Sequence, residues 1–177
     1  MKVILISGKA RHGKDTVASI MQTYLTISKN KKVLIAHYGD LVKYVCKTFF
    51  DWNGEKDEAG RSLLQYVGTD AVRAVYPNYW VDFIADMLTV FKDKWDYVII
   101  PDARFPNEIT RMKEKGLDVE TFRVIRPNFE SDLTAEQLKH SSETALDNFD
   151  FDHIISNNSN KKSLGKLIIN ICENMME

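Results

Sequence analysis

The feature that most constrains this chain is a glycine-rich stretch that follows a short apolar run near the start. The run Val3–Ser7 is typical of a strand buried on both faces of a parallel sheet. GKARHGKDT, residues 8–16, comes next, and from Lys14 to about Ser28 apolar side chains recur at helical spacing. A strand, a glycine turn and a helix in this order predict a phosphate-binding loop, because backbone N–H groups and a helix N-terminus both favour an anion.

The residues after the second glycine of this stretch are expected to meet the phosphates. Lys14 offers a positive charge to the β and γ phosphates of a nucleotide, and Arg11 is a further candidate contact. The usual pattern has Ser or Thr directly after the lysine to hold magnesium, whereas here Asp15 takes that position and Thr16 follows. Asp15 and Thr16 are the candidate Mg²⁺ contacts of the loop, and which of them touches the metal stays open. The alternative is that both residues only cap the following helix.

Charge and cysteine use exclude several classes of protein. The 177 residues fit one domain, and 24 basic against 25 acidic residues give a net charge of -1, so stable binding to nucleic acid is not expected. Cys46 and Cys172 are far apart and lack metal-ligand spacing, which argues against a disulfide framework or a structural zinc and fits a reducing cytosol. The apolar start is too short for a signal peptide or membrane span. We therefore expect a cytoplasmic protein without a membrane partner.

Four more apolar runs predict strands, and stretches with helical periodicity separate them. The predicted strands are Val33–Ala36, Tyr97–Ile100, Val119–Ile125 and Ile154–Ile155. The predicted helices are Gly39–Phe49, Ser62–Val75, Tyr79–Lys92, Pro106 to about Gly116, and Lys162–Met175. Residues 51–61 are predicted to be a surface loop, and residues 128–149 either a functional lid or disordered. Strands that alternate with helices predict an α/β fold whose parallel sheet is covered on both faces.

The third predicted helix carries a candidate binding face. Gln65, Thr69 and Arg73 are spaced by four residues and share one side of the helix. An amide, a hydroxyl and a guanidinium there could bind a base edge and a phosphate; a solvated helix face is the alternative. Tyr79 and Trp80 follow, and from the sequence alone they are better explained as core aromatics.

Polar residues also follow three of the predicted strands, at the sheet edge where ligands bind in parallel sheets. Asp102 ends the third strand, where it could reach a magnesium ion or the attacking oxygen, and Arg104 follows with a fork suited to phosphate oxygens. Their alternative is a helix-capping Asp beside a surface Arg. Asp40 and Lys43 follow the second strand. Arg126 ends the fourth, where it could stack on a purine, hold a phosphate or simply be an exposed charge.

Taken together, these stretches resemble the deoxynucleoside monophosphate kinases of tailed bacteriophages, within the P-loop nucleoside monophosphate kinase superfamily. The matching stretches are GKDT at the end of residues 8–16, LLQYVGTDAVR at 63–73, the Tyr79-Trp80 pair, IIPDARFPNE at 99–108, RVIRP at 123–127 and HSSETALDNFDFDHIISN at 140–157. The resemblance implies a three-layer α/β/α P-loop NTPase fold with a five-stranded parallel sheet. It also implies magnesium-ATP as the donor and a lid over its phosphates.

The resemblance assigns roles to residues in three groups. Those expected to hold ATP phosphates are Gly8, Gly13, Lys14, Asp15 and Thr16, with residues 157–159, including Asn157, near the adenine. Those expected to line the monophosphate pocket are Gln65, Thr69, Asp70, Arg73 and Trp80. Asp102 would serve the magnesium and the acceptor, while Arg104 and Arg126 would balance phosphate charge. The single domain 1–177 would thus carry acceptor-binding helices within about 40–95 and a lid at about 128–149.

Two departures from the family bear on specificity. The chain is short between the second helix and Arg61, and its lid is poor in basic residues, with only Lys139 beside His140. The GKD loop and the LDNFDFDHIISN tail also resemble phosphomevalonate kinases, and a non-catalytic nucleotide-binding protein is a third interpretation. We expect a kinase that moves the ATP γ-phosphoryl group to a deoxynucleoside monophosphate. The accepted base is left open, and a homodimer is a possible assembly.

Overall fold

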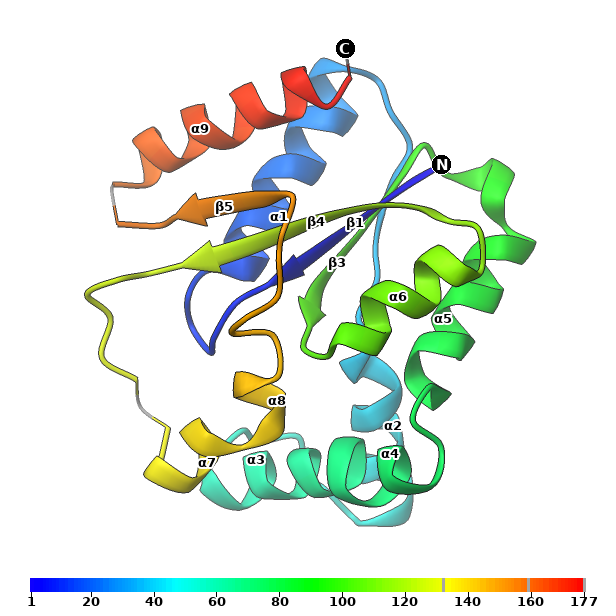
Figure 1. Cartoon of the computed structure of the whole chain (residues 1–177), viewed down its shortest axis with the longest axis vertical. Coiled ribbons are helices and arrows are strands. Elements are labelled where there is room, and N and C mark those ends of the chain that lie inside the picture. The colour runs from blue at the N-terminus through cyan, green and yellow to red at the C-terminus, as the bar shows by residue number, and fades with distance from the viewer. Residues whose placement is uncertain (132, 159, 177) are drawn as a thin grey trace.

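The computed structural model describes residues 1–131, 133–158 and 160–176. In these residues one five-stranded, all-parallel sheet has the order β2-β3-β1-β4-β5 (Figure 1). The strands are β1 (Lys2–Ser7), β2 (Val33–Ile35), β3 (Tyr97–Ala103), β4 (Asp118–Ile125) and β5 (His153–Ser156). The predicted α/β fold with five parallel strands is confirmed, and the strand that precedes the glycine-rich loop lies at the centre of the sheet.

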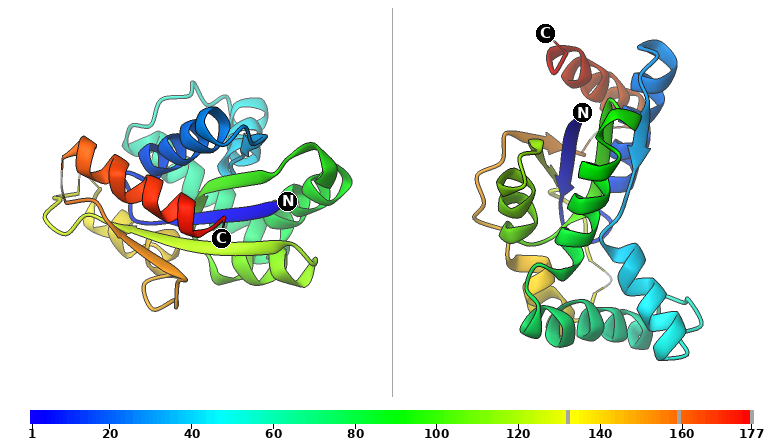
Figure 2. Two further views of the ribbon diagram at one scale, coloured as in Figure 1. Left: turned by 90° about the horizontal axis from the view of Figure 1, so that it is seen from above. Right: turned by 90° about the vertical axis from the view of Figure 1, so that its right-hand side faces the viewer.

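The continuous apolar run of β1 follows from its burial on both faces. Ile4 and Ile6 face a core cluster that includes α1 (Lys14–Thr23) and α9 (Lys161–Asn174). The alternate residues of β1 face a second cluster that includes α5 (Tyr79–Val90) and α6 (Pro106–Glu114). Figure 2 shows these two pairs of helices on opposite sides of the sheet. Such a strand cannot alternate polar with apolar residues, because neither face meets water.

The third strand is longer than its apolar run predicts. Its pairing with β1 passes from Leu5↔Ile100 to Ser7↔Ala103, so one strand gains an extra residue at Pro101-Asp102. Proline has no N–H to donate to a ladder, and a bulge is where a sheet tolerates it. The strand therefore continues past Pro101 to Ala103, and Asp102 lies within the strand rather than after its end.

A long helical rod crosses the molecule at the carboxyl end of the strands. It consists of α3 (Glu58–Gln65), a π-helical segment (Tyr66–Ala71) and α4 (Val72–Val75), and α2 (Gly39–Phe49) packs beside it (Figure 1). The predicted loop over residues 51–61 is wrong in its last part, because the helix begins at Glu58. Asp57 caps it by accepting a hydrogen bond from the Gly60 N–H at 2.7 Å, a local signal that the sequence already contained.

The segment predicted as a lid carries two short helices, α7 (Ala135–Lys139) and α8 (Ser141–Thr144). They lie at the same end of the molecule as α3 (Figure 1). Both cysteines are buried free thiols, and they belong to different core clusters. Within the described residues, no helix combines the length and apolar character needed to cross a membrane.

Candidate active site

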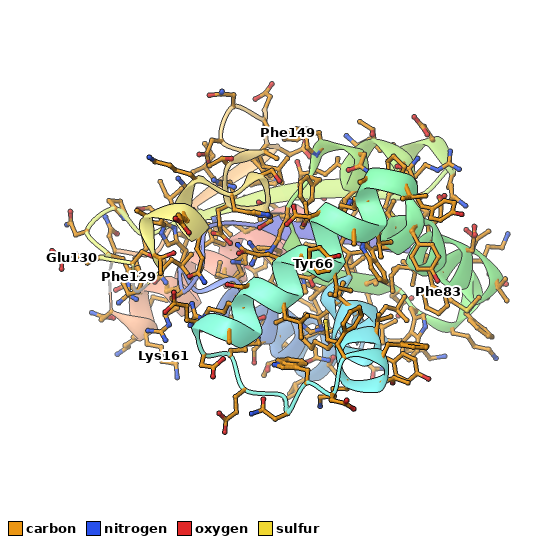
Figure 3. All side chains as sticks on the ribbon, turned by 90° about the horizontal axis from the view of Figure 1, so that it is seen from below. Tyr66, Phe83, Phe129, Glu130, Phe149 and Lys161 are labelled. Atoms are coloured by element: carbon orange, nitrogen blue, oxygen red, sulfur yellow. The ribbon has the colours of Figure 1, made fainter. Side chains whose placement is uncertain are left out.

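A cavity of about 390 Å³ lies at the carboxyl edge of the sheet, where parallel sheets bind their ligands. It is bordered by the glycine-rich loop, the end of β3, the start of α2, the α3–α4 rod and the lid. Figure 3 looks at this end of the molecule and shows the rod crossing in front of the strand ends. The predicted site residues that line the cavity are Arg11, Lys14, Asp15, Lys43, Gln65, Thr69, Arg73, Trp80, Asp102 and Arg104.

Both glycines of the loop are required by backbone geometry and by close neighbours. Gly8 and Gly13 have φ angles of 154° and 100°. A Cβ atom at Gly8 would lie 2.5 Å from the carbonyl oxygen of Val124, and one at Gly13 would lie 2.5 Å from Nδ2 of Asn157. Asn157 in turn donates from Nδ2 to the carbonyl oxygen of His12 at 3.0 Å. Asn157 therefore supports the loop from behind; its expected proximity to adenine stays a prediction, and Ser159 of the same stretch lies outside the described residues.

Lys14 lies under the loop rather than in solvent. Its Nζ donates to the carbonyl oxygens of Gly8 at 2.7 Å and Lys9 at 2.9 Å. Burial, together with a smaller effect of the nearby Arg104, lowers the pKa of Lys14 to about 8. The hydrogen-bond partners of this ammonium group are neutral carbonyl oxygens. A phosphate in the loop would stabilise its charged form, so the site favours an anion.

Asp15 and Thr16 differ in their access to the cavity. Asp15 lines it with a side chain that is 87% exposed, and its Oδ1 lies 3.8 Å from Nε2 of His37. Thr16 is half-buried and lies outside the lining. The N-cap of α1 is Gly13, so neither Asp15 nor Thr16 occupies the cap position, although Asp15 lies in the first turn of the helix, and the choice between a metal role and a helix-end role stays a prediction.

Asp102 lines the cavity and also binds the start of α2, whereas Arg104 lines the cavity rather than lying as a free surface charge. Asp102 Oδ1 accepts from the Tyr38 N–H at 3.1 Å and its Oδ2 from the Gly39 N–H at 2.8 Å. Each carboxylate oxygen keeps a second lone pair. Among the described residues no cluster of three or more His, Cys, Asp or Glu side chains could hold a metal by itself. Asp15 and Asp102 nevertheless suit magnesium, because Mg²⁺ needs only one or two carboxylates when phosphates and water complete its shell.

A buried carboxylate that the sequence did not single out holds Arg73, one of the predicted acceptor residues. Glu108 is fully buried at the start of α6; its Oε1 pairs with Arg73, and its Oε2 accepts from the backbone N–H groups of Arg104 at 2.6 Å and Phe105 at 3.1 Å. Burial raises the pKa of the Glu108 carboxyl, and the Arg73 guanidinium opposes that rise. Arg73 also lies 4.3 Å above the Phe105 ring. Arg73 is thus held at the cavity wall from two sides.

The predicted face of Gln65, Thr69 and Arg73 lines one wall of the cavity. Asp70 turns elsewhere and lies 3.3 Å from Nε2 of His140 in the lid, outside the cavity lining. Trp80 is only 2% exposed, and its Nε1 donates to the carbonyl oxygen of Gly68 at 2.8 Å. Trp80 therefore fits the expectation of a core aromatic, with part of its surface forming the cavity wall. The same expectation is wrong for Tyr79, whose side chain lies at the surface.

The lid contacts the loop through a second carboxylate that the sequence did not single out. Glu143 is 7% exposed; its Oε2 accepts from the Ala10 N–H at 3.2 Å and its Oε1 pairs with Arg104. Arg104 also donates to the carbonyl oxygen of Ser142 at 3.0 Å. A lid carboxylate thus uses a loop N–H and a guanidinium, which are the groups that bind phosphate oxygens in such loops.

The other predicted residues lie at the rim or beyond it. Lys43 lines the cavity and donates to Oδ1 of Asp40 at 2.7 Å, while Asp40 itself is outside the lining. The Arg126 N–H donates to Nδ1 of His12 at 3.1 Å, and its guanidinium lies 4.6 Å from the Phe129 ring centre. Phe129 is at the edge of the molecule in Figure 3. Arg126 therefore lies at the root of the lid, and a role in phosphate charge stays a prediction.

Comparison with known proteins identifies relatives along most of the chain. Residues 25–168 match the family model described as "Deoxynucleotide monophosphate kinase". The deoxynucleotide monophosphate kinase of Enterobacteria phage T4 is 32% identical over 67% of this chain, although the match spans only 47% of that enzyme. A putative deoxynucleotide monophosphate kinase of Acanthamoeba polyphaga mimivirus is 26% identical over 98% of this chain and 97% of its own length.

Solved structures share the fold at low identity. The APS kinase of Mycobacterium tuberculosis in complex with AMPPNP and APS superposes with a TM-score of 0.54 at 13% identity, covering 97% of each chain. An unliganded sugar kinase from Janibacter sp. HTCC2649 gives a TM-score of 0.56 at 13% identity, covering 96% of this chain and 93% of that one. At such identities the likeness concerns the fold alone.

Proposed function

The chain belongs to the deoxynucleotide monophosphate kinase family, and from this premise we propose that it transfers the γ-phosphoryl group of ATP to a deoxynucleoside 5′-monophosphate. The products are ADP and the deoxynucleoside diphosphate. The observation that carries the proposal is one cavity that joins a phosphate loop to a wall of Gln65, Thr69 and Arg73. Such a cavity can hold a phosphate donor and a phosphate acceptor at the same time.

The cations around the cavity suit in-line phosphoryl transfer. Lys14 reaches it from the loop, Arg104 from the end of β3 and Arg73 from α4, so positive charge surrounds the space between donor and acceptor. A monophosphate oxygen is already a nucleophile, and catalysis then consists mainly of positioning and charge stabilisation. Mg²⁺ held near Asp15 and Asp102 would neutralise phosphate charge. No residue has to act as a strong base.

The lid suits the exclusion of water. It reaches the loop through Glu143 and the π-helical segment through the contact of His140 with Asp70. Transfer to water would waste ATP, and closure of a lid over the donor is the usual way in which kinases avoid it. The expected cytoplasmic location and the possible homodimer stay predictions.

An ADP-release assay tests this function. The purified protein is given ATP and Mg²⁺ with each of the four deoxynucleoside monophosphates, with mevalonate 5-phosphate, or with no acceptor. We expect release well above the acceptor-free rate with one or more of the deoxynucleotides. Release with mevalonate 5-phosphate alone would support the phosphomevalonate kinase alternative, and no release with any acceptor would support a binding protein.

A further inference from the structure

One buried side-chain amide in the lid lacks the partner that its burial demands. Gln137 of α7 is 6% exposed and lines the cavity. Across residues 1–131, 133–158 and 160–176, its Nε2 is the one buried side-chain nitrogen or oxygen without a hydrogen-bond partner. Buried polar groups are nearly always paired, because an unmade hydrogen bond leaves the cost of desolvation uncompensated. Such a group beside a cavity points to a bound ligand as its partner.

The rest of the Gln137 side chain is held in place, so the free donor has a defined orientation. Its Oε1 accepts from the Thr134 N–H at 3.3 Å, and its own N–H donates to Oγ1 of Thr134 at 3.2 Å, which together form a capping box. Exchanging the amide oxygen and nitrogen would set an NH₂ group against the Thr134 N–H, two donors facing each other. The unpartnered group is therefore the NH₂ of Gln137, in a side chain that lines the cavity.

The chemistry of the cavity that Gln137 lines suits a nucleobase as its partner better than a phosphate. Phosphate oxygens attract cations, and the cavity already offers them Lys14, Arg73 and Arg104. Leu64 and Leu133 add apolar surface to the same cavity, as flat apolar rings require. Together with the function proposed above, on which this step rests, these observations lead to a specific assignment. We propose that Gln137 determines base specificity by donating a hydrogen bond from Nε2 to the base of the acceptor nucleotide.

The test compares Gln137→Met with Thr134→Ala across the four deoxynucleoside monophosphates. Methionine keeps the length of the side chain and removes its donor. Thr134→Ala weakens the α7 cap but keeps the backbone N–H that orients Gln137, so it serves as the matched control. We expect Gln137→Met to lower kcat/KM at least tenfold for the best acceptor. The kcat/KM values of the four deoxynucleoside monophosphates should therefore differ less from one another than in the wild type. The Kd of ATP should stay within twofold in both variants, and Thr134→Ala should keep the wild-type ranking of acceptors.

Three results would overturn the inference while leaving the proposed function intact. Wild-type kcat/KM values in Gln137→Met would show that the amide makes no contact with the acceptor. An equal loss for all four nucleotides would place the contact on the shared sugar or phosphate. A matching selective loss in Thr134→Ala would show that α7 stability, rather than the donor, is responsible. A wild-type protein that phosphorylates none of the four would instead overturn the proposed function and this inference with it.

Discussion

The proposed donor and acceptor ends of the cavity are built in opposite ways. The donor end is one continuous stretch, residues 8–16, whose glycines, lysine and helix start act together because they are neighbours in the chain. The acceptor end takes side chains from α2, the α3–α4 rod, α5, β3 and the lid, which are far apart in sequence. A site formed by one stretch of the chain can be predicted from the sequence, whereas a site formed by several elements depends on how those elements pack. The two ends should therefore respond differently to substitution.

Removal of the loop lysine should have the largest effect and should act at the donor end. Lys14→Ala should lower kcat at least 100-fold, since the loss of a group that stabilises developing phosphate charge costs about 3 kcal/mol or more. The fold should survive, because the ammonium group makes its hydrogen bonds within the loop, to the carbonyl oxygens of Gly8 and Lys9. Steady-state kinetics and a thermal melt check both points. Near-normal turnover in a folded Lys14→Ala variant would contradict the role of Lys14 in catalysis.

The buried state of the same lysine should also appear in the pH dependence of stability. Its pKa is about 8 in the folded protein and near 10.5 when unfolded, so the folded state binds fewer protons between these values. The free energy of unfolding should therefore rise with pH across this window, by at most about 1.4 kcal/mol per pH unit. Buried tyrosine and cysteine groups with raised pKa values act in the opposite direction. They are common to wild type and Lys14→Met, so the difference between the two denaturation series isolates Lys14; equal slopes would contradict its lowered pKa.

A change at the acceptor end should separate the two substrates. Arg73→Ala should lower kcat/KM for the deoxynucleotide about tenfold or more, while the Kd of ATP changes little, because Arg73 lines the cavity from α4 and not from the loop. Stability should fall too, since Glu108 is left buried without its guanidinium partner. Arg111→Ala is the matched control, because Arg111 also belongs to an ion pair, with Asp82 at 2.7 Å, but does not line the cavity. If the affinity for ATP fell as much as kcat/KM for the deoxynucleotide, the assignment of Arg73 to acceptor binding would be wrong.

The magnesium requirement should sharpen the assignment of Asp15 at the donor end. Asp15→Ala should raise the Mg²⁺ concentration for half-maximal rate several-fold, because a hard oxygen ligand is lost. Asp15→Ser, which restores the common loop pattern, should be tolerated better. The thermal midpoint should hardly move in either variant, as the side chain is 87% exposed and Gly13 holds the cap position. An unchanged Mg²⁺ titration together with a lower midpoint would make Asp15 a structural residue.

The smallest effect is expected where the lid meets the loop. Glu143 accepts a hydrogen bond from the Ala10 N–H and forms an ion pair with Arg104. Its carboxylate therefore competes with phosphate oxygens for both groups. Glu143→Gln removes the charge and keeps the shape, and it should tighten ATP binding about threefold by calorimetry. Weaker ATP binding would instead mean that Glu143 holds Arg104 in the position that ATP needs.

The sequence by itself determined the local parts of this protein. A run buried on both faces has to be continuously apolar, which made β1 recognisable, and the loop and helix that follow need no distant residue to be interpreted. The spacing of Gln65, Thr69 and Arg73 likewise follows from helix geometry alone, and the three do line one cavity. Even the helix start at Glu58, which was missed, had a local signal in Asp57.

Only the tertiary structure decided which polar groups become buried and what they face. In the sequence Glu108 looks like an ordinary polar residue of a helix, and Gln137 and Glu143 look like ordinary polar residues of the predicted lid, yet each is buried beside the cavity. Glu143 meets a loop N–H that is 133 residues away, and Glu108 meets Arg73 at a separation of 35. No periodicity encodes such pairs, because they arise when separate elements pack together. Burial then changes the chemistry of a polar group by removing water and leaving it only the partners that the fold, or a ligand, provides.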